Sequence, residues 1–321
     1  MKNKIIIIGG DPNSINSEIL YKSWRKLNDK IKRKIYLIAN YELIYKQFKK
    51  LNFKTNISKV KSISDNNFSN NLKIINIPLN FKNPFKVSLD GASKYTIGSL
   101  ELAHKLAKNI EVKGIINCPI NKKLIRKTKK IGVTEFLSNK CKVDKNSEVM
   151  VIYNKKLSVV PLTTHISIKN VSKSINSKLI LKKITTLNKG FKELFKKKPK
   201  IAVLGLNPHN AEFHKDSEEN QKILPAISKL RKKGINIKGP IAADTIFVNN
   251  YKKYDVIVGM YHDQVLTPFK TLFQFDAINL TLGLNYIRVS PDHGPGIDLI
   301  KKNKANYLSL FQCIKFINNL N

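Results

Sequence analysis

Short runs of apolar, mostly β-branched residues alternate along the chain with longer segments in which apolar positions recur every three or four residues. The short runs predict strands and the longer segments predict amphipathic helices. Strands are expected at residues 4–10, 34–39, 73–77, 112–119, 148–153, 157–164, 200–209, 254–259 and 276–290. Helices are expected at residues 17–29, 41–51, 88–109, 177–196, 216–234 and 306–320.

This alternation is typical of an α/β protein with a largely parallel sheet and helices on both faces. The chain has 321 residues, which is long enough for two lobes. It contains no internal repeat, low-complexity linker or boundary rich in Pro and Gly. A second lobe is therefore expected to be interleaved with the first.

The formal net charge of +37 is typical of proteins that bind nucleic acid or a membrane surface. Most of the 59 basic residues are Lys, however, and Arg occurs only at positions 25, 33, 126, 231 and 288. Arg makes the forked contacts to phosphate and guanine on which nucleic-acid recognition depends. The favoured interpretation is an enzyme with a Lys-rich surface and no specific nucleic-acid partner. A polyanion-binding protein is the alternative from another class.

The cysteines, at positions 118, 141 and 313, form no CxxC pair, so the sequence predicts neither a disulfide framework nor a zinc ribbon. The apolar run at the start is too short for a signal peptide, and no apolar stretch approaches the length of a membrane span. We expect a cytoplasmic protein with no membrane partner.

Three of the six histidines follow predicted strands. His165 stands in LTTHISIKN, His209 in GLNPHNAEFH and His262 in GMYHDQ. Ligands of open α/β sheets gather beyond the carboxyl ends of strands. Each histidine alone is best explained as a hydrogen-bonded turn residue, but the three together favour a catalytic metal site. Imidazole ligands suit zinc, manganese, cobalt or iron.

Lys270, Asn279 and Arg288 form a second group of polar residues in otherwise apolar surroundings. Two cations and an amide are suited to a phosphate monoester or a carboxylate. A salt bridge from Arg288 to Asp292 or Asp298 is the alternative. A dinucleotide site of the Rossmann type is not predicted, because the Gly9–Gly10 pair lacks the spaced glycines that should follow, and no Walker A sequence is present.

Further segments stand out as a set: GDPNSINSEI, PINKKLI, TEFL, TTHISIKNV, GLNPHNAE, GPIAADTIF, MYHDQVLTPFK and INLTLGLNYIRVSPDHG. They span nearly the whole chain, and their combination is highly specific. In this order they resemble the 4-hydroxythreonine-4-phosphate dehydrogenase family of vitamin B6 synthesis.

The resemblance implies a fold like that of isocitrate and isopropylmalate dehydrogenases: two α/β/α lobes around a cleft, without a Rossmann domain. It also implies a homodimer with shared active sites. We expect residues 1–130 and 268–321 to form the first lobe. Residues 131–267 would form the second lobe, which carries the metal-ligand loops and the dimer interface.

The resemblance also implies roles for individual residues. His165, His209 and His262 would hold a divalent metal, either zinc, magnesium or cobalt, at the dimer interface. The implied substrate contacts come from position 133 and from Thr134, Lys270, Asn279 and Arg288. Asp244 and Asp263 are two candidate bases that the sequence does not rank, and Lys270 is a further catalytic candidate that positions the substrate.

The implied reaction is the oxidation of 4-phosphooxy-L-threonine by NAD or NADP to 2-amino-3-oxo-4-phosphooxybutanoate, which decarboxylates to 3-amino-2-oxopropyl phosphate. The residues that contact the nicotinamide stay unassigned.

The chain departs from the family pattern at three places. Val133 stands where the family has His, Ser14 and Asn16 replace glycines, and Pro295 with Gly296 alters the DHGTA segment. Because Val133 removes a polar substrate contact, a related dehydrogenase of a phosphorylated sugar acid, 4-phospho-threonate or 4-phospho-erythronate, is the nearest alternative.

Overall fold

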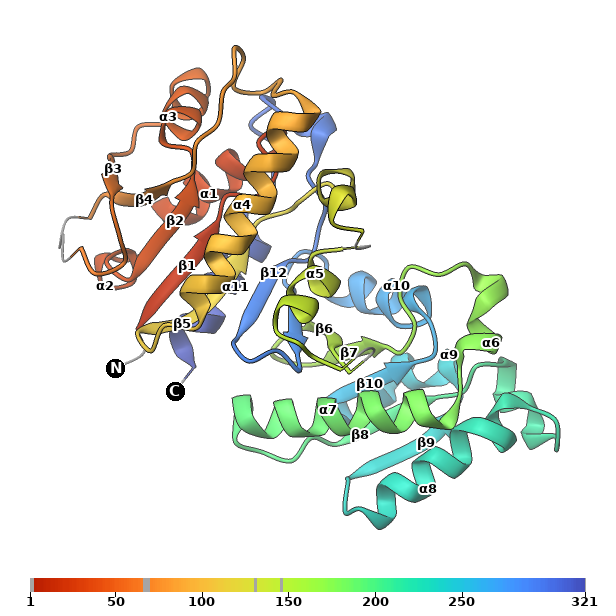
Figure 1. Ribbon diagram of the computed structural model, residues 1–321. Helices are drawn as coiled ribbons and strands as arrows, with labels where there is room; N and C mark the ends of the chain where they lie inside the picture. The colour runs from red at the N-terminus through yellow and green to blue at the C-terminus, as the bar shows by residue number, and fades with distance from the viewer. Residues whose placement is uncertain (1–2, 66–69, 130–131, 145–146, 321) are drawn as a thin grey trace. The chain divides into compact units, whose positions relative to one another are not determined.

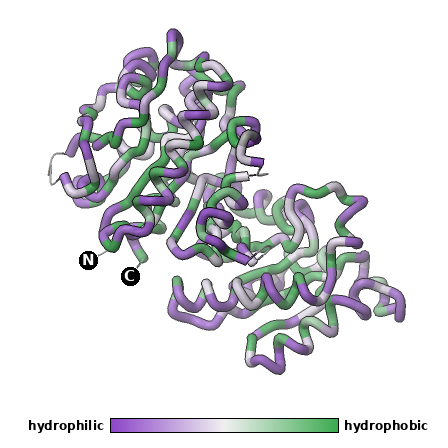
Figure 2. Tube along the Cα trace, viewed as in Figure 1, coloured by the Kyte–Doolittle hydropathy of each residue, from purple (hydrophilic) through white to green (hydrophobic). Residues whose placement is uncertain are grey.

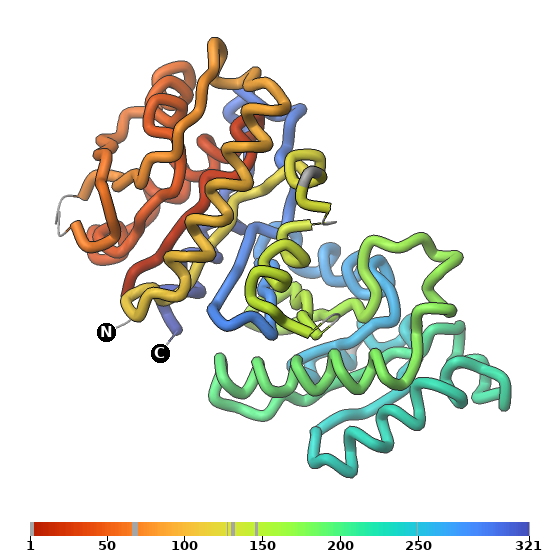
Figure 3. The backbone as a smooth tube through the Cα atoms, in the orientation of Figure 1, coloured from red at the N-terminus to blue at the C-terminus, as the bar shows by residue number. Residues whose placement is uncertain are grey.

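The computed structural model describes residues 3–65, 70–129, 132–144 and 147–320. The chain forms two compact units. Unit 1 comprises Met1–Lys142 and Leu284–Asn321, and unit 2 comprises Val143–Gly283. Both chain ends belong to unit 1, so the chain leaves this unit once and returns to it, as the red and blue ends of the tube show (Figure 3).

The boundaries of the units differ from those expected from sequence. The expected boundary at residues 130 and 131 lies outside the described residues. The expected boundary after residue 267 would cut α10 (His262–Phe273) in two. This helix is continuous, and its buried Val265, Leu266 and Phe269 belong to the hydrophobic core of unit 2, so the whole helix stays with that unit.

The strands of unit 1 are all parallel and lie in the order β3-β4-β2-β1-β5-β12. Their bounds are β1 (Lys4–Ile8), β2 (Ile35–Ala39), β3 (Ile57–Val60), β4 (Leu72–Asn76), β5 (Val112–Asn117) and β12 (Arg288–Pro291). The isoleucines at positions 5–8 are all fully buried, although successive side chains of a strand point to opposite faces. Both faces of this sheet are therefore covered, as expected from the sequence.

The helices of unit 1 follow the periodicity of the sequence closely. Their bounds are α1 (Asn16–Arg25), α2 (Asp29–Lys32), α3 (Tyr41–Lys50), α4 (Leu89–Ala107), η1 (Lys122–Thr128), α5 (Val133–Lys140), η7 (Ile297–Leu299) and α11 (Leu308–Asn319). Ser88 caps α4, because its hydroxyl accepts a hydrogen bond from the Gly91 N–H. Leu100 and Ala103 of α4 belong to the same buried hydrophobic cluster as Ile6 and Ile8 of β1, and α4 runs across the strands β1 and β5 (Figure 1).

The strands of unit 2 lie in the order β11-β6-β7-β10-β8-β9. Their bounds are β6 (Val149–Tyr153), β7 (Ser158–Pro161), β8 (Ile201–Leu204), β9 (Ile237–Ile241), β10 (Val256–Gly259) and β11 (Ile278–Leu282). β6 runs antiparallel to β7 and β11, and the other pairs are parallel. A hairpin at residues 154–157 joins β6 to β7. Apolar residues follow the strands, and hydrophilic residues cover the outer helices (Figure 2).

Helical segments connect these strands, and several elements of the two units were missed from the sequence. The segments are η2 (Ile168–Asn170), α6 (Val171–Ser174), α7 (Ser177–Phe195), η3 (Pro208–Phe213), η4 (Glu219–Ile223), α8 (Leu224–Lys232), α9 (Ala243–Thr245), η5 (Ile246–Asn250), η6 (Tyr251–Lys253) and α10. The sequence did not predict the strands β3 and β9, or the helices α5 and α10, the last of which contains Pro268. Over the described residues, no helix combines the length and apolar character that crossing a bilayer requires.

Candidate active site

Three histidines follow the carboxyl ends of three neighbouring strands in unit 2. β10 pairs in parallel with β7 on one side and with β8 on the other, so the three strands end at one edge of the sheet. His165 follows β7, His209 lies in η3 after β8, and His262 begins α10 after β10. We call this the histidine edge. It is the kind of edge at which open α/β sheets bind ligands.

The imidazole rings of His165 and His262 have centres 6.1 Å apart. An ion that takes one nitrogen from each ring at about 2.1 Å would separate the two ring centres by about 5 to 6 Å. The separation of the two rings is slightly above this range, so they lie close to the spacing of two ligands of one metal ion. Within a single chain, and over the residues described, no group of three His, Cys, Asp or Glu side chains is placed to hold a metal.

The His262 ring is oriented by its neighbour. Its Nδ1 lies 2.7 Å from Oδ1 of Asp263. A carboxylate accepts hydrogen bonds, so this contact favours the tautomer in which Nδ1 carries the proton and Nε2 has the lone pair that a metal requires. Asp263 is largely exposed, with 76% of its side chain accessible. Asp244, the other candidate base, is exposed on the short helix α9.

His209 lies in a left-handed turn. Residues 209–213 all have positive φ angles, between 47° and 58°. This conformation costs non-glycine residues roughly 1 kcal/mol each, so neighbouring groups have to hold it. The fully buried carboxylate of Glu219 contributes, because its Oε1 accepts hydrogen bonds from the N–H groups of Leu206 at 2.7 Å and Asn207 at 2.8 Å.

Gly205 ends the run of buried residues that begins in β8, and the turn requires it to be glycine. A Cβ at this position would lie 2.2 Å from Oδ1 of Asn210 and 3.0 Å from Oε1 of Glu219. Any side chain would therefore displace the groups that hold the turn. The unusual sequence GLNPHN thus has a structural reason as well as a candidate functional one.

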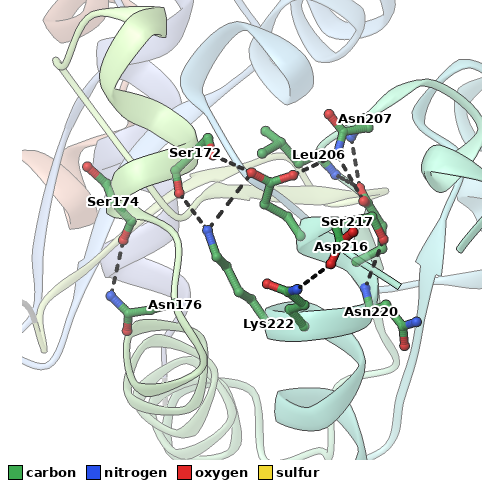
Figure 4. A network of polar contacts seen from close by, with 12 residues as sticks. Ser172, Ser174, Asn176, Leu206, Asn207, Asp216, Ser217, Asn220 and Lys222 are labelled. Atoms are coloured by element: carbon green, nitrogen blue, oxygen red, sulfur yellow. Dashed lines mark hydrogen bonds and ion pairs between the residues drawn. The ribbon is translucent and has the colours of Figure 1, made fainter. Parts of the chain in front are cut away.

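A second carboxylate, Glu218, joins the segment after His165 to this turn (Figure 4). It accepts hydrogen bonds from the Ser172 hydroxyl and from Nδ2 of Asn207, the latter at 2.9 Å. These two bonds, with the Ser172 bond the larger, hold the pKa of Glu218 below its ordinary value. Lys222 completes the network by donating to the Ser172 carbonyl at 3.1 Å.

Unit 1 brings two of the predicted substrate residues together. Arg288, at the start of β12, donates from NH1 to the Thr134 hydroxyl at 3.3 Å and from Nε to Oδ1 of Asn117 at 2.7 Å. Arg288 is only 3% exposed, and burial lowers its pKa to about 10. The guanidinium is therefore still a cation at neutral pH, held by neutral oxygens in the interior of unit 1.

The remaining predicted residues are placed differently. Val133, at the start of α5, packs against the hydrophobic core of unit 1. Lys270 is exposed in the last turn of α10, and Asn279 lies in β11 of unit 2 with a buried Oδ1 that accepts no hydrogen bond from the residues that the structure describes. Asn117, which orients Arg288, was missed from the sequence; the signal was a polar residue that ends a buried strand.

With this geometry established, the chain can be compared with known proteins. The family described as "Pyridoxal phosphate biosynthetic protein PdxA" matches residues 30–317. The chain belongs to the PdxA family. Among curated PdxA relatives, a 4-hydroxythreonine-4-phosphate dehydrogenase of Sulfurihydrogenibium sp. (strain YO3AOP1) is 39% identical over 97% of this chain and 96% of its own. The enzyme of the same name from Aquifex aeolicus (strain VF5) is 36% identical over 100% and 99%.

Solved structures agree with membership of the PdxA family. A crystal structure of 4-hydroxythreonine-4-phosphate dehydrogenase from Klebsiella pneumoniae superposes with a TM-score of 0.87 at 28% identity, over 99% of this chain and 97% of that one. Isocitrate dehydrogenase from Methylococcus capsulatus shares the fold alone, with a TM-score of 0.50 at 12% identity over 99% of this chain and 85% of its own. The α/β fold and the family expected from sequence are thus confirmed.

Proposed function

We propose that this chain is a 4-hydroxythreonine-4-phosphate dehydrogenase, an oxidoreductase of pyridoxal phosphate synthesis. It would oxidise 4-phosphooxy-L-threonine at C3 to 2-amino-3-oxo-4-phosphooxybutanoate, with NAD or NADP accepting the hydride. The observation that carries the proposal is the histidine edge in a chain of the PdxA family. The His165 and His262 rings, 6.1 Å apart, supply the donors that a divalent metal needs.

His165, His209 and His262 are the residues that would hold the metal, which we expect to be zinc, magnesium or cobalt. A bound divalent ion supplies Lewis acidity toward the C3 oxygen. Asp263 keeps the His262 ring in the tautomer that presents Nε2. A carboxylate, Asp244 or Asp263, takes the proton of the C3 hydroxyl as the C3–H hydride leaves.

Oxidation at C3 places a ketone next to C2, so the C1 carboxylate can then depart. The C1–C2 bond breaks, CO₂ leaves, and the electron pair enters the C3 carbonyl to form an enolate. Protonation at C2 gives 3-amino-2-oxopropyl phosphate.

Arg288 and Thr134 supply the charge and the hydroxyl for the anionic part of the substrate. Because Arg288 is held at Nε by Asn117, its guanidinium is oriented before any anion binds, which reduces the entropy lost on binding. We assign anion binding to Lys270 and Asn279 as well, on the resemblance alone. A forked guanidinium suits a phosphate better than an ammonium does.

We propose a homodimer with shared active sites. Large apolar side chains stand exposed beside the histidines: Ile166 is 42% exposed, Ile168 is 68% exposed and Phe213 is 45% exposed. Apolar side chains grouped beside a polar site favour contact with a protein partner. A second copy would cover them and could complete the ligand set.

The packing of Val133 favours one alternative substrate. Its side chain fills apolar space where the family has a polar residue. A phosphorylated sugar acid without the amine, 4-phospho-threonate or 4-phospho-erythronate, is therefore the second candidate.

The test is a metal-stripped enzyme assayed for NADH or NADPH formation with 4-phosphooxy-L-threonine, and with both sugar acids in parallel. We expect activity to return with zinc, cobalt or magnesium. His209→Ala should lower activity by more than about 100-fold, because a metal ligand is lost. His214→Ala, in the same exposed segment, is the matched control. Full activity without metal, or in His209→Ala, would refute the proposed metal site, and faster turnover of a sugar acid would favour the alternative.

A further inference from the structure

A chain of hydrogen bonds runs across the histidine edge, from the exit of β7 through that of β10 to that of β8. The Met260 carbonyl accepts from the Thr163 hydroxyl at 2.7 Å and from the Thr163 N–H at 3.2 Å. The Met260 N–H donates to Oε1 of Gln264 at 2.7 Å. Nε2 of Gln264 then donates to the Gly205 carbonyl at 2.7 Å.

Each of the three strand exits joined in this way precedes a histidine. Thr163 lies two residues before His165, Met260 two residues before His262, and Gly205 four residues before His209. The bonds between Thr163 and Met260 are made by main-chain groups and by the Thr163 hydroxyl. The other two bonds of this chain are both made by the Gln264 side chain. It connects the His262 exit directly to the His209 exit.

Gln264 acts where the sheet ladder between β10 and β8 has ended. The last paired residues of these strands are Val258 and Val203. Beyond them the amide of Gln264 bridges the two exits, and Gly259 leaves room for it. A Cβ on Gly259 would lie 2.9 Å from Oε1 of Gln264 and 2.5 Å from Cγ1 of Val265.

We propose that Gln264 is a positioning residue that fixes the spacing of the three histidine-bearing segments before the metal binds. This inference rests on the proposed metal site. His165 and His209 are exposed and have left-handed backbones, and His262 is only partly buried, so burial of the rings does not fix their separation. Groups that orient metal ligands raise metal affinity by about 10- to 100-fold.

The test compares Gln264→Met with Asn154→Leu. Methionine keeps the length of the side chain but makes neither hydrogen bond. Asn154 is a matched control, because its amide also bridges two main-chain groups of unit 2: it donates to the Asp276 carbonyl and accepts from the Lys156 N–H at 2.9 Å. It stands in the β6–β7 hairpin, at the opposite end of β7 from His165.

The affinity of each full-length, metal-stripped protein for Co²⁺ and Zn²⁺ is measured by competition with a chromophoric chelator, and its Tm is measured without metal. We expect Gln264→Met to weaken binding by about tenfold or more. Asn154→Leu should lower Tm and leave the affinity unchanged. Thr163→Val should have a smaller effect than Gln264→Met, because the Thr163 N–H still donates to Met260.

An unchanged metal affinity in Gln264→Met would overturn the inference, and so would an equal loss in Asn154→Leu at a similar Tm. Failure of the unsubstituted protein to bind either ion would instead overturn the proposed metal site. If Gln264→Met does not fold, Gln264→Asn decides, because its shorter side chain cannot reach both main-chain groups: an affinity equal to that of the unsubstituted protein would overturn the inference.

Discussion

The two units differ in the charges that they bury. Unit 1 buries two cations, Arg288 at 3% exposure and Lys73 at 1%, together with the carboxylates of Asp11 at 4% and Glu18 at 1%. Unit 2 buries an anion, Glu219, which is fully inaccessible, while His165 and His209 lie on exposed loops and His262 is partly exposed at the start of α10. Burying a charge raises the free energy of the folded state unless hydrogen bonds satisfy the charged group. Each of these buried groups therefore needs hydrogen-bond partners.

The difference shows two ways of preparing a polar site. In unit 1 the proposed anion-binding group is itself in the interior, and neutral oxygens of Asn117 and Thr134 orient it. In unit 2 the proposed ligands are outside, and the buried carboxylate holds the backbone that presents one of them. Substitutions in unit 1 should therefore affect substrate binding directly, whereas those beneath the histidine edge should act through the loop.

Among the substitutions that compare the buried charges of the two units, Arg288→Lys has the largest expected effect. Lysine preserves the charge but cannot donate to Asn117 and Thr134 and still present a fork to an anion. We expect kcat/KM for 4-phosphooxy-L-threonine to fall by about 100-fold. Steady-state NADH formation measures it. Arg25→Lys, on the exposed end of α1, is the control and should be neutral. A kcat/KM within about threefold of the unsubstituted value would show that the fork is not needed.

Glu219→Ala should have the next largest effect. It leaves the buried N–H groups of Leu206 and Asn207 without their acceptor, and each such loss costs about 1 to 3 kcal/mol. We expect the free energy of unfolding, measured in urea, to fall by about 3 kcal/mol. The free energy of unfolding should fall less in Glu219→Gln, because the Oε1 of glutamine can still accept both hydrogen bonds.

The control for Glu219→Ala is Glu193→Ala, at an exposed position near the end of α7, where we expect almost no change. If Glu219→Ala were as stable as the Glu193 variant, the left-handed turn would not depend on this carboxylate. The view that a buried carboxylate holds the loop that carries His209 in unit 2 would then be wrong.

Much of the fold could be predicted from sequence, for a clear physical reason. The isoleucine run of β1 and the helical stripe of α4 follow from local periodicity, which the structure preserves. The helix α10 could not be predicted from sequence, because Pro268 is unfavourable inside a helix. Only the packing of Val265 and Phe269 against the core of unit 2 offsets this unfavourable effect.

The candidate site shows the same limit. That His165, His209 and His262 follow strands was visible in the sequence. Their order at the edge was not, because β10 inserts between β7 and β8. The partners of Arg288 were also hidden: the sequence suggested nearby acids, whereas the structure gives Asn117 and Thr134, from segments more than a hundred residues away.

The smallest expected effect concerns the second buried cation of unit 1. Lys73 of β4 donates to the Arg33 carbonyl and lies 4.4 Å from the centre of the Tyr36 ring. Burial, with a smaller effect of Lys4, lowers its pKa from 10.5 to about 8. Below pH 8 the residue is protonated in both the folded and the unfolded chain, so folding bears the full cost of burying the charge.

Between pH 8 and 10.5 the unfolded chain binds more protons at Lys73 than the folded chain does, so this residue's contribution to stability improves as the pH rises through that window. Lys73→Met should therefore raise the free energy of unfolding at pH 7 by about 1 kcal/mol, after loss of the Arg33 and Tyr36 contacts offsets part of the gain. The advantage should shrink towards pH 10.5. Lys59→Met changes an exposed lysine on the neighbouring strand β3 and should show no such trend with pH. A destabilised Lys73→Met at pH 7 would mean that the contacts of this ammonium outweigh its burial, and that unit 1 holds both of its buried cations at a net gain.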